Sequence, residues 1–168
     1  MPKFFIALSA AVTAILGSAS VASATDLTDE VRRATERFQD VAVATAAGYA
    51  QFLGCVSGPQ EGAMGIHYVN GDLVGDGQLD PQRPEALMYE AKDGRLRLVG
   101  VEFIVLADAW NASSPSPPTL LGQSFHYTGS PNRYGIPAFY ALHVWAWKHN
   151  PHGMFVDWNP KVSCEEHK

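Results

Sequence analysis

The stretch Arg95–Leu106, RLRLVGVEFIVL, decides the fold that this sequence predicts. Its apolar residues fall on both faces of an extended strand, which is typical of a strand inside a sheet rather than at its edge. Glu85–Ala91 precedes it and is predicted as a second strand. Lys92-Asp93-Gly94 between them is typical of a hairpin turn, with glycine at the position that needs a positive φ. We therefore expect an antiparallel sheet centred on residues 95–106.

An amphipathic helix is predicted before this sheet, from Thr28 to about Phe52. Apolar and small residues recur there at helical spacing. Asp26 or Thr28 can cap its start, because either side chain can accept a hydrogen bond from a free backbone N–H. One face of this helix is expected to pack on the sheet.

The segment between the predicted helix and the hairpin contains one short predicted strand, Gly65–Asn70, with the sequence GIHYVN. Glycine and proline dominate residues 56–65, and residues 73–84 are mostly polar. Both segments are therefore expected to be loops.

The aromatic-rich segment Pro137–Trp158, PAFYALHVWAWKHNPHGMFVDW, allows two interpretations. A helix over 137–149 places His143 and Trp147 on one face, whereas a strand places His143, Trp145 and Trp147 together. The helix is favoured, because proline is common at the first helical position and a second proline follows soon after residue 149. The predicted fold class is thus α+β, with N-terminal and C-terminal helices packed on the sheet of one domain.

The first 24 residues have the features of a secretory signal peptide. Lys3 is followed by an apolar run over residues 4–17 and by Ala22-Ser23-Ala24, a small-residue cleavage signature. We expect residues 1–24 to be removed and residues 25–168 to form a single domain that is secreted or periplasmic. No later segment is apolar enough to cross a bilayer, so no stable membrane insertion is expected after cleavage.

Two cysteines, Cys55 and Cys164, remain after the predicted cleavage. Two thiols in one small exported domain usually pair, so one disulfide is predicted between them. A pair of metal-binding thiolates is the weaker alternative, because neither cysteine has a C-x-x-C partner.

Charge and motif content narrow the classes of function. The formal net charge is −5 and the sequence contains no basic stripe, so nucleic acid is not expected as a partner. The sequence also lacks a nucleophile elbow, an H-E-x-x-H helix, a phosphate-binding loop and a haem attachment motif. Whether the protein is an enzyme therefore stays open, and a small molecule or another protein is the expected partner.

The first functional hypothesis is an exported binding module with a pocket lined by aromatic and histidine side chains. Aromatic rings supply apolar area, and a few polar groups orient a ligand. Gly100 leaves space beside Glu102 on the same strand face. The predicted ligand-binding residues are Glu102, Tyr140, His143, Trp145 and Trp147.

The second hypothesis is a metal-binding protein or a mononuclear metal-dependent enzyme. Glu102 interrupts an apolar strand, and a buried carboxylate is costly unless it is paired, protonated or bound to a metal. His67 and His143 lie in other apolar segments and, with Glu102, provide a ligand set for zinc or iron, with His126 as a possible fourth ligand. The alternative is ordinary: hydrogen-bonded core histidines, and Glu102 paired with Arg95, Arg97 or Arg133.

A third hypothesis places copper at the turn that follows the aromatic segment. His149, His152 and Met154 combine two imidazoles with a thioether, and this combination suits Cu(I) in an exported protein. Such a site would be shallow and exchangeable, as a copper carrier needs.

Overall fold

The structure is a computed structural model that describes residues 24–167. The helices are α1 (Ala24–Thr35), the 3-10 helix η1 (Glu36–Gln39), α2 (Val41–Ala46), α3 (Gly71–Asp76) and α4 (Ala107–Ser113). The strands are β1 (Ala50–Gly58), β2 (Gly62–Val69), β3 (Ala86–Lys92), β4 (Arg95–Leu106), β5 (Thr119–Leu120), β6 (Gln123–Ser124), β7 (His126–Thr128) and β8 (Phe139–Val144). The predicted signal peptide lies outside the described residues, except for Ala24, and remains a prediction.

A curled antiparallel sheet with the strand order β1-β2-β3-β4-β8-β7 forms the body of the molecule. The predicted β3–β4 hairpin is confirmed, and its turn residues Asp93 and Gly94 both have positive φ. β4 is the central strand that its sequence predicts, because β3 pairs with one side of it and β8 with the other. The predicted α+β fold class is also confirmed.

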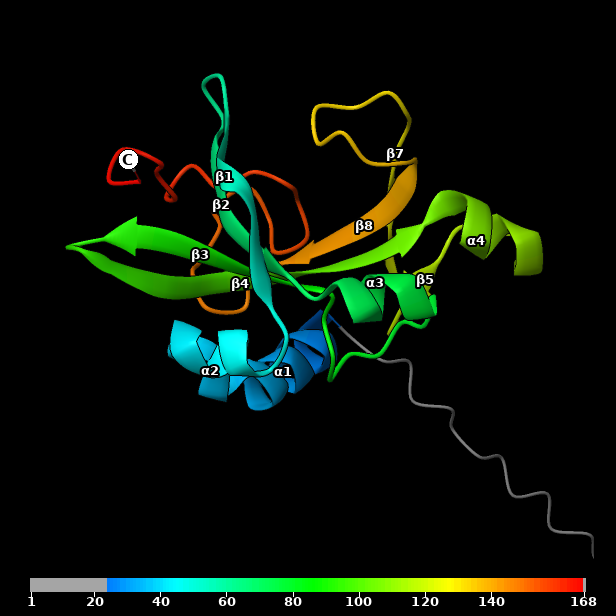
Figure 1. Ribbon diagram of the computed structural model, residues 1–168, viewed down its shortest axis with the longest axis horizontal. Helices are drawn as coiled ribbons and strands as arrows, with labels where there is room; N and C mark the ends of the chain where they lie inside the picture. The colour runs from blue at the N-terminus through cyan, green and yellow to red at the C-terminus, as the bar shows by residue number, and fades with distance from the viewer. Residues whose placement is uncertain (1–23, 168) are drawn as a thin grey trace, which may run out of the picture.

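One face of the sheet carries the main hydrophobic core. Cross-strand neighbours point to the same face, and the row Leu87–Val101–Val144 marks this one. α1, η1 and α2 cover it, as Figure 1 shows below the sheet. Leu27 and Val31 of α1 are fully buried there. This face therefore supplies most of the apolar burial that stabilises the domain.

The opposite face is narrower and mixed in character. Its row Ala86–Glu102–His143 places charged and polar groups between two small apolar clusters. Three parts of the chain lie on this side: the β1–β2 hairpin, the segment 129–138 and residues 159–167, called the C-terminal segment below (Figure 1). The polar row on this face is therefore covered by a hairpin and loops rather than by helices.

The predicted long N-terminal helix is wrong in its second half. The helical segment breaks at Asp40, whose carboxylate accepts a hydrogen bond from the Ala42 backbone and caps the short α2. Residues 50–58, predicted in part as helix and in part as loop, instead form edge strand β1. The helical spacing gave a wrong prediction here because the spaced positions belong to four consecutive elements, α1, η1, α2 and β1, rather than to one helix.

The favoured C-terminal helix is also wrong, because residues 139–144 form strand β8. All six residues are buried, and they lie between β4 and β7 in the sheet. A helix here would have left the backbone groups at one side of β4 without partners, which is costly for a buried strand. The strand alternative is correct, although the strand ends at Val144.

The two predicted loops are likewise shorter than expected. Residues 56–65 contain the tight β1–β2 turn and the ends of both strands, so their glycines serve a hairpin rather than a long loop. The segment after Asn70 begins with helix α3, because the Asn70 side chain accepts hydrogen bonds from Asp72 N and Leu73 N. The predicted strand over 65–70 is confirmed as part of β2.

The predicted disulfide Cys55–Cys164 is present, with a Cα–Cα distance of 5.6 Å. It joins β1 to the C-terminal segment. Val162 of this segment is buried against the sheet, and Asn159 forms a bridge with Ala63 of β2. The C-terminal segment is thus attached to the sheet by packing, backbone pairing and one covalent bond.

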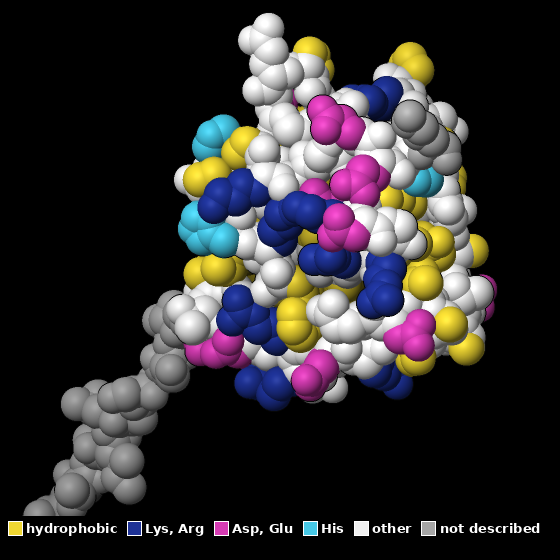
Figure 2. Space-filling model, turned by 90° about the vertical axis from the view of Figure 1, so that its left-hand side faces the viewer, with side chains coloured by type: hydrophobic (Ala, Val, Ile, Leu, Met, Phe, Trp, Pro, Cys, Tyr) yellow, Lys and Arg dark blue, Asp and Glu magenta, His cyan; other side chains and the backbone are white. Residues whose placement is uncertain are grey.

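The surface that carries the β3–β4 turn and the chain end shows basic and acidic side chains interspersed (Figure 2). Two of its contacts are the ion pairs Arg97–Asp93 and Lys148–Glu90. Within residues 24–167 no helix combines the length and apolar character needed to span a membrane.

The buried Glu85 gives a first testable prediction. Burial raises the pKa of Glu85 to about 8, although its carboxylate accepts a hydrogen bond from Ile104 N. Because this folded-state pKa lies above the ordinary value, the folded state holds an extra proton between about pH 4.5 and 8. As the pH rises through this window, the unfolding free energy should fall, by at most about 1.4 kcal/mol per pH unit for one proton.

Glu85→Gln removes this titration and keeps an acceptor for Ile104 N. We expect the variant to match the wild type near pH 5 and to be more stable at pH 8, by chemical denaturation at each pH. The exposed Glu165→Gln is the control and should leave the pH profile unchanged. An equal stability difference at both pH values would contradict the prediction.

Candidate metal centre

Three side chains that the sequence singled out converge on the mixed face of the sheet. His67 comes from β2, Glu102 from β4 and His143 from β8, and one ligand atom of each lies within 4.8 Å of the others. All three are buried, with exposed fractions of 6, 7 and 3 per cent. The two imidazole rings meet edge to face, with their centroids 6.3 Å apart.

The sheet register explains this convergence. Glu102 and His143 are direct cross-strand partners. His67 is brought toward them across β3 because the sheet curls, and β3 places only the small Ala86 opposite Glu102. Gly100 allows β8 to approach closely, since a Cβ atom there would lie 2.7 Å from the carbonyl oxygen of Val144.

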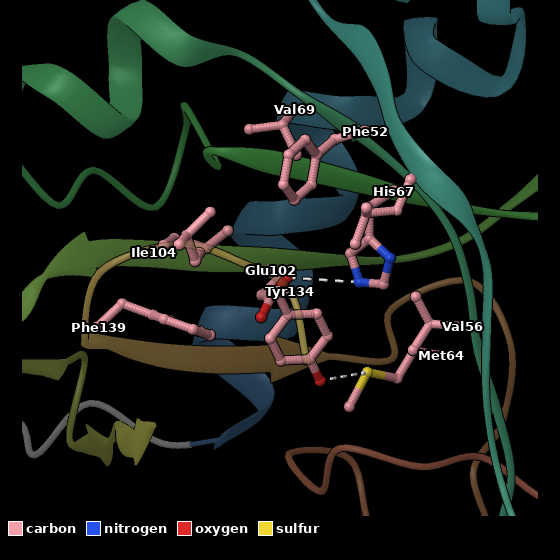
Figure 3. A pocket seen from close by; sticks show the side chains of 11 residues that line it. Phe52, Val56, Met64, His67, Val69, Glu102, Ile104, Tyr134 and Phe139 are labelled. Atoms are coloured by element: carbon pink, nitrogen blue, oxygen red, sulfur yellow. Dashed lines mark hydrogen bonds and ion pairs between the residues drawn. The ribbon is translucent and has the colours of Figure 1, made fainter. Parts of the chain in front are cut away.

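The histidine nitrogens that face Glu102 are both Nε2. His67 Nε2 lies 3.4 Å from Glu102 Oε2, and His143 Nε2 lies 3.7 Å from Glu102 Oε1. The carboxylate is therefore placed between two imidazoles. Figure 3 shows the contact between His67 and Glu102.

The protonation states of the three groups differ because their surroundings differ. Burial, together with the nearby His143, lowers the pKa of His67 to about 3, so this ring is neutral at neutral pH. Burial raises the pKa of Glu102, and His143 partly offsets this effect. Burial alone would lower the pKa of His143, but Glu102 and Asp157 outweigh it and raise the pKa.

The outer nitrogen of His143 faces a carboxylate. Asp157 Oδ1 lies 3.3 Å from His143 Nδ1 and 3.1 Å from His126 Nδ1. Within the described part of the chain, however, neither ring nitrogen of His143 has a hydrogen bond of good geometry. On the other side of the group, His67 has a hydrogen bond with the Gly65 backbone. Each imidazole thus has a second polar neighbour besides Glu102.

A cavity of about 40 Å³, counted as the space open to the centre of a water molecule, adjoins His67 and Glu102. One water needs about 10–15 Å³ by this measure, so the cavity has room for a metal ion with a small ligand. His143 is not among its lining residues. The rest of the lining is apolar apart from one hydroxyl group: Phe52, Leu53, Val56, Met64, Val69, Ile104, Tyr134, Ile136 and Phe139.

His126, the predicted fourth ligand, lies outside the group. Its side chain is 57 per cent exposed and reaches the group only through Asp157. Glu102 also does not have the arginine partner that the ordinary alternative required: the ion-pair partners found for it among residues 24–167 are His67 and His143.

The five predicted ligand-binding residues are divided between the two faces of the sheet. Tyr140 packs in the helix-side core, and its hydroxyl donates to Asn111. Trp147 packs on the same core and donates to Thr35 Oγ1. Trp145 lies on the other face, where its ring stacks on His143 at a centroid distance of 6.4 Å. Only Trp145 thus shares a face with Glu102 and His143.

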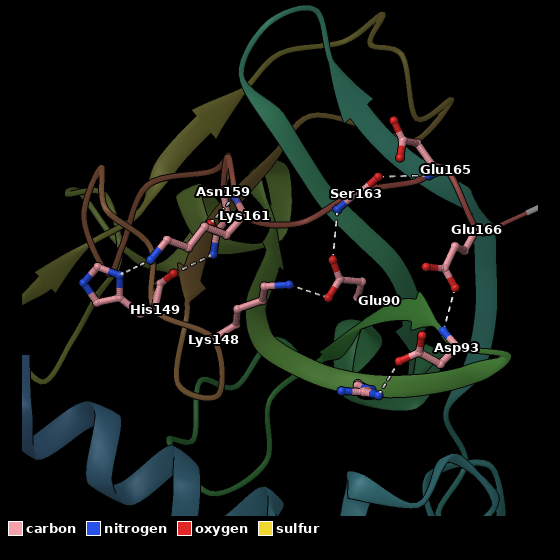
Figure 4. A network of polar contacts seen from close by, with 10 residues as sticks. Glu90, Asp93, Lys148, His149, Asn159, Lys161, Ser163, Glu165 and Glu166 are labelled. Carbon is pink, nitrogen blue, oxygen red and sulfur yellow. Dashed lines mark hydrogen bonds and ion pairs between the residues drawn. The ribbon is translucent and has the colours of Figure 1, made fainter.

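The residues of the predicted copper turn make separate contacts. His149 Nδ1 lies 3.4 Å from Lys161 Nζ, within the polar network of the C-terminal segment that Figure 4 shows. Met154 accepts a hydrogen bond from Thr28 of α1. His152 is exposed at the turn, where its backbone N–H donates to Asn150. Copper at this turn stays a prediction.

Two groups near the candidate centre, Asp157 and Met64, were not among the predicted site residues. Asp157 lies in an irregular segment and reaches His143 only through the tertiary fold. Met64 belongs to a segment that was expected to be loop. The glycine after Met64 was the one available signal, because glycine inside a strand often marks a bulge.

Comparisons of the chain with protein-family models, with curated proteins and with solved structures found no match in any of the three.

Proposed function

We propose that this protein binds one transition-metal ion at His67, Glu102 and His143. The observation that carries the proposal is the convergence of two Nε2 atoms and one carboxylate within 4.8 Å in a buried place. Without a metal ion, this arrangement buries a carboxylate and leaves both ring nitrogens of His143 without a good hydrogen bond. Such groups are normally satisfied, so their placement calls for a binding partner.

The surroundings of the three residues also suit metal binding. Metal-binding histidines usually donate their other ring N–H to a carboxylate or to a backbone carbonyl, which fixes the ring and its tautomer. Asp157 at His143 and the Gly65 backbone at His67 are placed for these roles. The low pKa of His67 keeps its ring neutral, as ligation requires.

Two histidines and one carboxylate suit zinc or iron and leave at least one coordination position open. Because His67 and Glu102 line the cavity, this open position would face it. The cavity favours a small and largely apolar ligand, since its lining is mostly apolar. An exported location, as the signal sequence and the disulfide indicate, belongs to the proposal.

The second candidate function is metal-independent binding of a small ligand in the same cavity. It is favoured by one observation: Phe52 and Leu53 of β1 line the cavity and are 37 and 44 per cent exposed. These side chains could close on an apolar ligand. Binding that persists in metal-free protein would favour this function over the first.

The proposal is tested by metal content. Protein purified without chelator, saturated with Zn(II) and freed of excess should retain one equivalent by elemental analysis. Glu102→Gln keeps the size of the side chain but removes the charged ligand. Changes outside the coordination shell cost about 10- to 100-fold in metal affinity. Loss of this ligand should therefore weaken Zn(II) binding by more than that. His143→Ala should behave in the same way.

Glu85→Gln is the matched control, because Glu85 is another buried glutamate that does not belong to the group. It should bind Zn(II) like the wild type. Wild-type protein that retains no metal, or Glu102→Gln that binds as tightly as Glu85→Gln, would overturn the proposed function.

A further inference from the structure

Met64 reaches the same cavity as His67 because of a β-bulge. Residues three positions apart in a regular strand point to opposite faces of the sheet. In β2, Gly65 pairs with Val56 and Ala63 pairs with Ser57, which leaves Met64 as an extra residue between them. A bulge re-aims a side chain, and here Met64 and His67 both line the cavity.

The bulge depends on a glycine. Gly65 has a φ of +96°, and a Cβ atom at this position would lie 2.5 Å from the carbonyl oxygen of Tyr89. No other residue fits there without moving the backbone of β3. The orientation of Met64 is therefore fixed by the sequence through Gly65, not left to the flexibility of a loop.

The thioether of Met64 is buried in the lining of the cavity, next to the one hydroxyl group of that lining. Met64 is 4 per cent exposed, and its sulfur lies 3.8 Å from the hydroxyl of Tyr134. Figure 3 shows Met64, Tyr134, His67 and Glu102 around the same space. The long methionine side chain has several rotatable bonds, so its sulfur can adjust to a ligand in that space.

We propose that Met64 is a fourth ligand of the centre and that the centre therefore prefers copper as Cu(I). This inference rests on the proposed function, since it adds a soft ligand to the site formed by His67, Glu102 and His143. Thioether sulfur selects Cu(I), whereas a set of imidazole and carboxylate ligands alone suits zinc or iron. The buried thioether thus determines which metal the site retains.

The test compares Cu(I) and Zn(II) affinity in the wild type, Met64→Leu and Met88→Leu. The Cu(I) affinity is measured by competition with a chromogenic Cu(I) chelator. A mild reducing agent keeps the copper as Cu(I) and leaves the disulfide intact. Met88 is the matched control, because it is a buried methionine on the same sheet face that does not line the cavity. All variants also carry Met154→Leu, which removes the sulfur of the predicted copper turn.

Met64→Leu should weaken Cu(I) binding at least about tenfold, since changes outside the coordination shell already cost 10- to 100-fold. Zn(II) affinity should stay unchanged, and Met88→Leu should change neither metal. Equal Cu(I) affinity in Met64→Leu and Met88→Leu would overturn the role of Met64, while Zn(II) binding that depends on Glu102 would still support the proposed function. Loss of both metals in Glu102→Gln, with normal behaviour of the control, supports the proposed function, and only a selective loss of Cu(I) affinity in Met64→Leu supports the role of Met64.

X-ray absorption of the Cu(I)-loaded Met154→Leu protein gives a second measurement that does not depend on the folding of Met64→Leu. A sulfur atom among the nearest neighbours of copper supports the inference. A shell of nitrogen and oxygen atoms alone overturns it, even where one equivalent of copper is bound.

Discussion

Replacing both cysteines by serine is expected to cost the domain on the order of 4 kcal/mol of unfolding free energy. The disulfide joins residues 109 positions apart. By the chain-entropy model, a cross-link that closes a loop of about this length restricts the unfolded chain by about 4 to 5 kcal/mol, less any strain in the folded state. Cys55→Ser with Cys164→Ser should therefore shift the urea midpoint strongly to lower concentration.

The contacts around the bridge determine what else is lost. The C-terminal segment is also held by Ser163 N, which donates to Glu90, and by Asp93 N, which donates to Glu166, as Figure 4 shows. These polar contacts are few and partly exposed, so they cannot replace the covalent bond. The segment should therefore detach first, before the helix-side core unfolds.

Hydrogen exchange measures this order directly. Amides of residues 159–167 should lose protection in the double variant under conditions where those of β4 keep it. Ser57→Ala with Ser163→Ala is a control that changes two nearby side chains and leaves the bridge. If the double cysteine variant were as stable as this control, the bridge would not restrict the unfolded chain as the loop-length argument requires.

The centre of the sheet could be predicted from the sequence because its signals are local. The apolar residues of 95–106 require cover on both faces, and the turn before them requires positive φ. Both signals can be recognised within residues 85–106 themselves, so no tertiary information was needed to predict the strand and its turn. The disulfide could be predicted for a different reason: with two cysteines in the chain, only one pairing exists.

The two wrong helix predictions have different physical causes. An apolar run such as residues 139–144 fits a helix face and a fully buried strand equally well, because both bury nearly every residue. The decision depends on whether β4 has a free edge for pairing, which the run itself does not contain. The long helix predicted over residues 28–52 is wrong for another reason: the helical spacing continues across Asp40, where the chain leaves η1 and the Asp40 side chain caps the start of α2.

The three residues of the candidate centre were predictable because each is unusual in its own segment. Glu102 interrupts an apolar strand, and His67 and His143 lie in apolar runs. Their order in space was not predictable, since it depends on the register of β4 with β8 and on the curl of the sheet. Met64 and Asp157 were missed because a bulge and an irregular segment, respectively, bring them to the site.

Metal binding is expected to stabilise the protein with a characteristic dependence on pH. At a free metal concentration about 1,000 times the dissociation constant, a ligand that binds only the folded state adds about 4 kcal/mol to the unfolding free energy. The measured quantity is the difference in unfolding free energy between metal-loaded and metal-free protein at each pH. Taking this difference removes the titrations that are unrelated to the centre.

The sign follows from protons that compete with the metal. Glu102 and Asp157 raise the pKa of His143, and burial raises the pKa of Glu102, so both groups bind protons at higher pH than usual. Metal must displace these protons, and the stabilisation should therefore decrease as the pH falls through the raised pKa values of His143 and Glu102. The change is about 1.4 kcal/mol per pH unit for each proton displaced. His67, with a pKa of about 3, contributes nothing in this window.

Asp157→Asn should change two quantities separately: the midpoint pH of this profile and the metal-dependent stabilisation at high pH. The variant loses a carboxylate that raises the pKa of His143, so the midpoint of the profile should move to lower pH. It also loses the outer partner of the ring, so the stabilisation at high pH should shrink by about 1.4 to 2.8 kcal/mol, equivalent to a 10- to 100-fold weaker affinity. Asp93→Asn, which changes an exposed aspartate paired with Arg97, should leave both quantities unchanged. If Asp157→Asn lowers the stability of the metal-free protein but keeps the midpoint pH and the metal-dependent stabilisation, Asp157 only holds its loop in place.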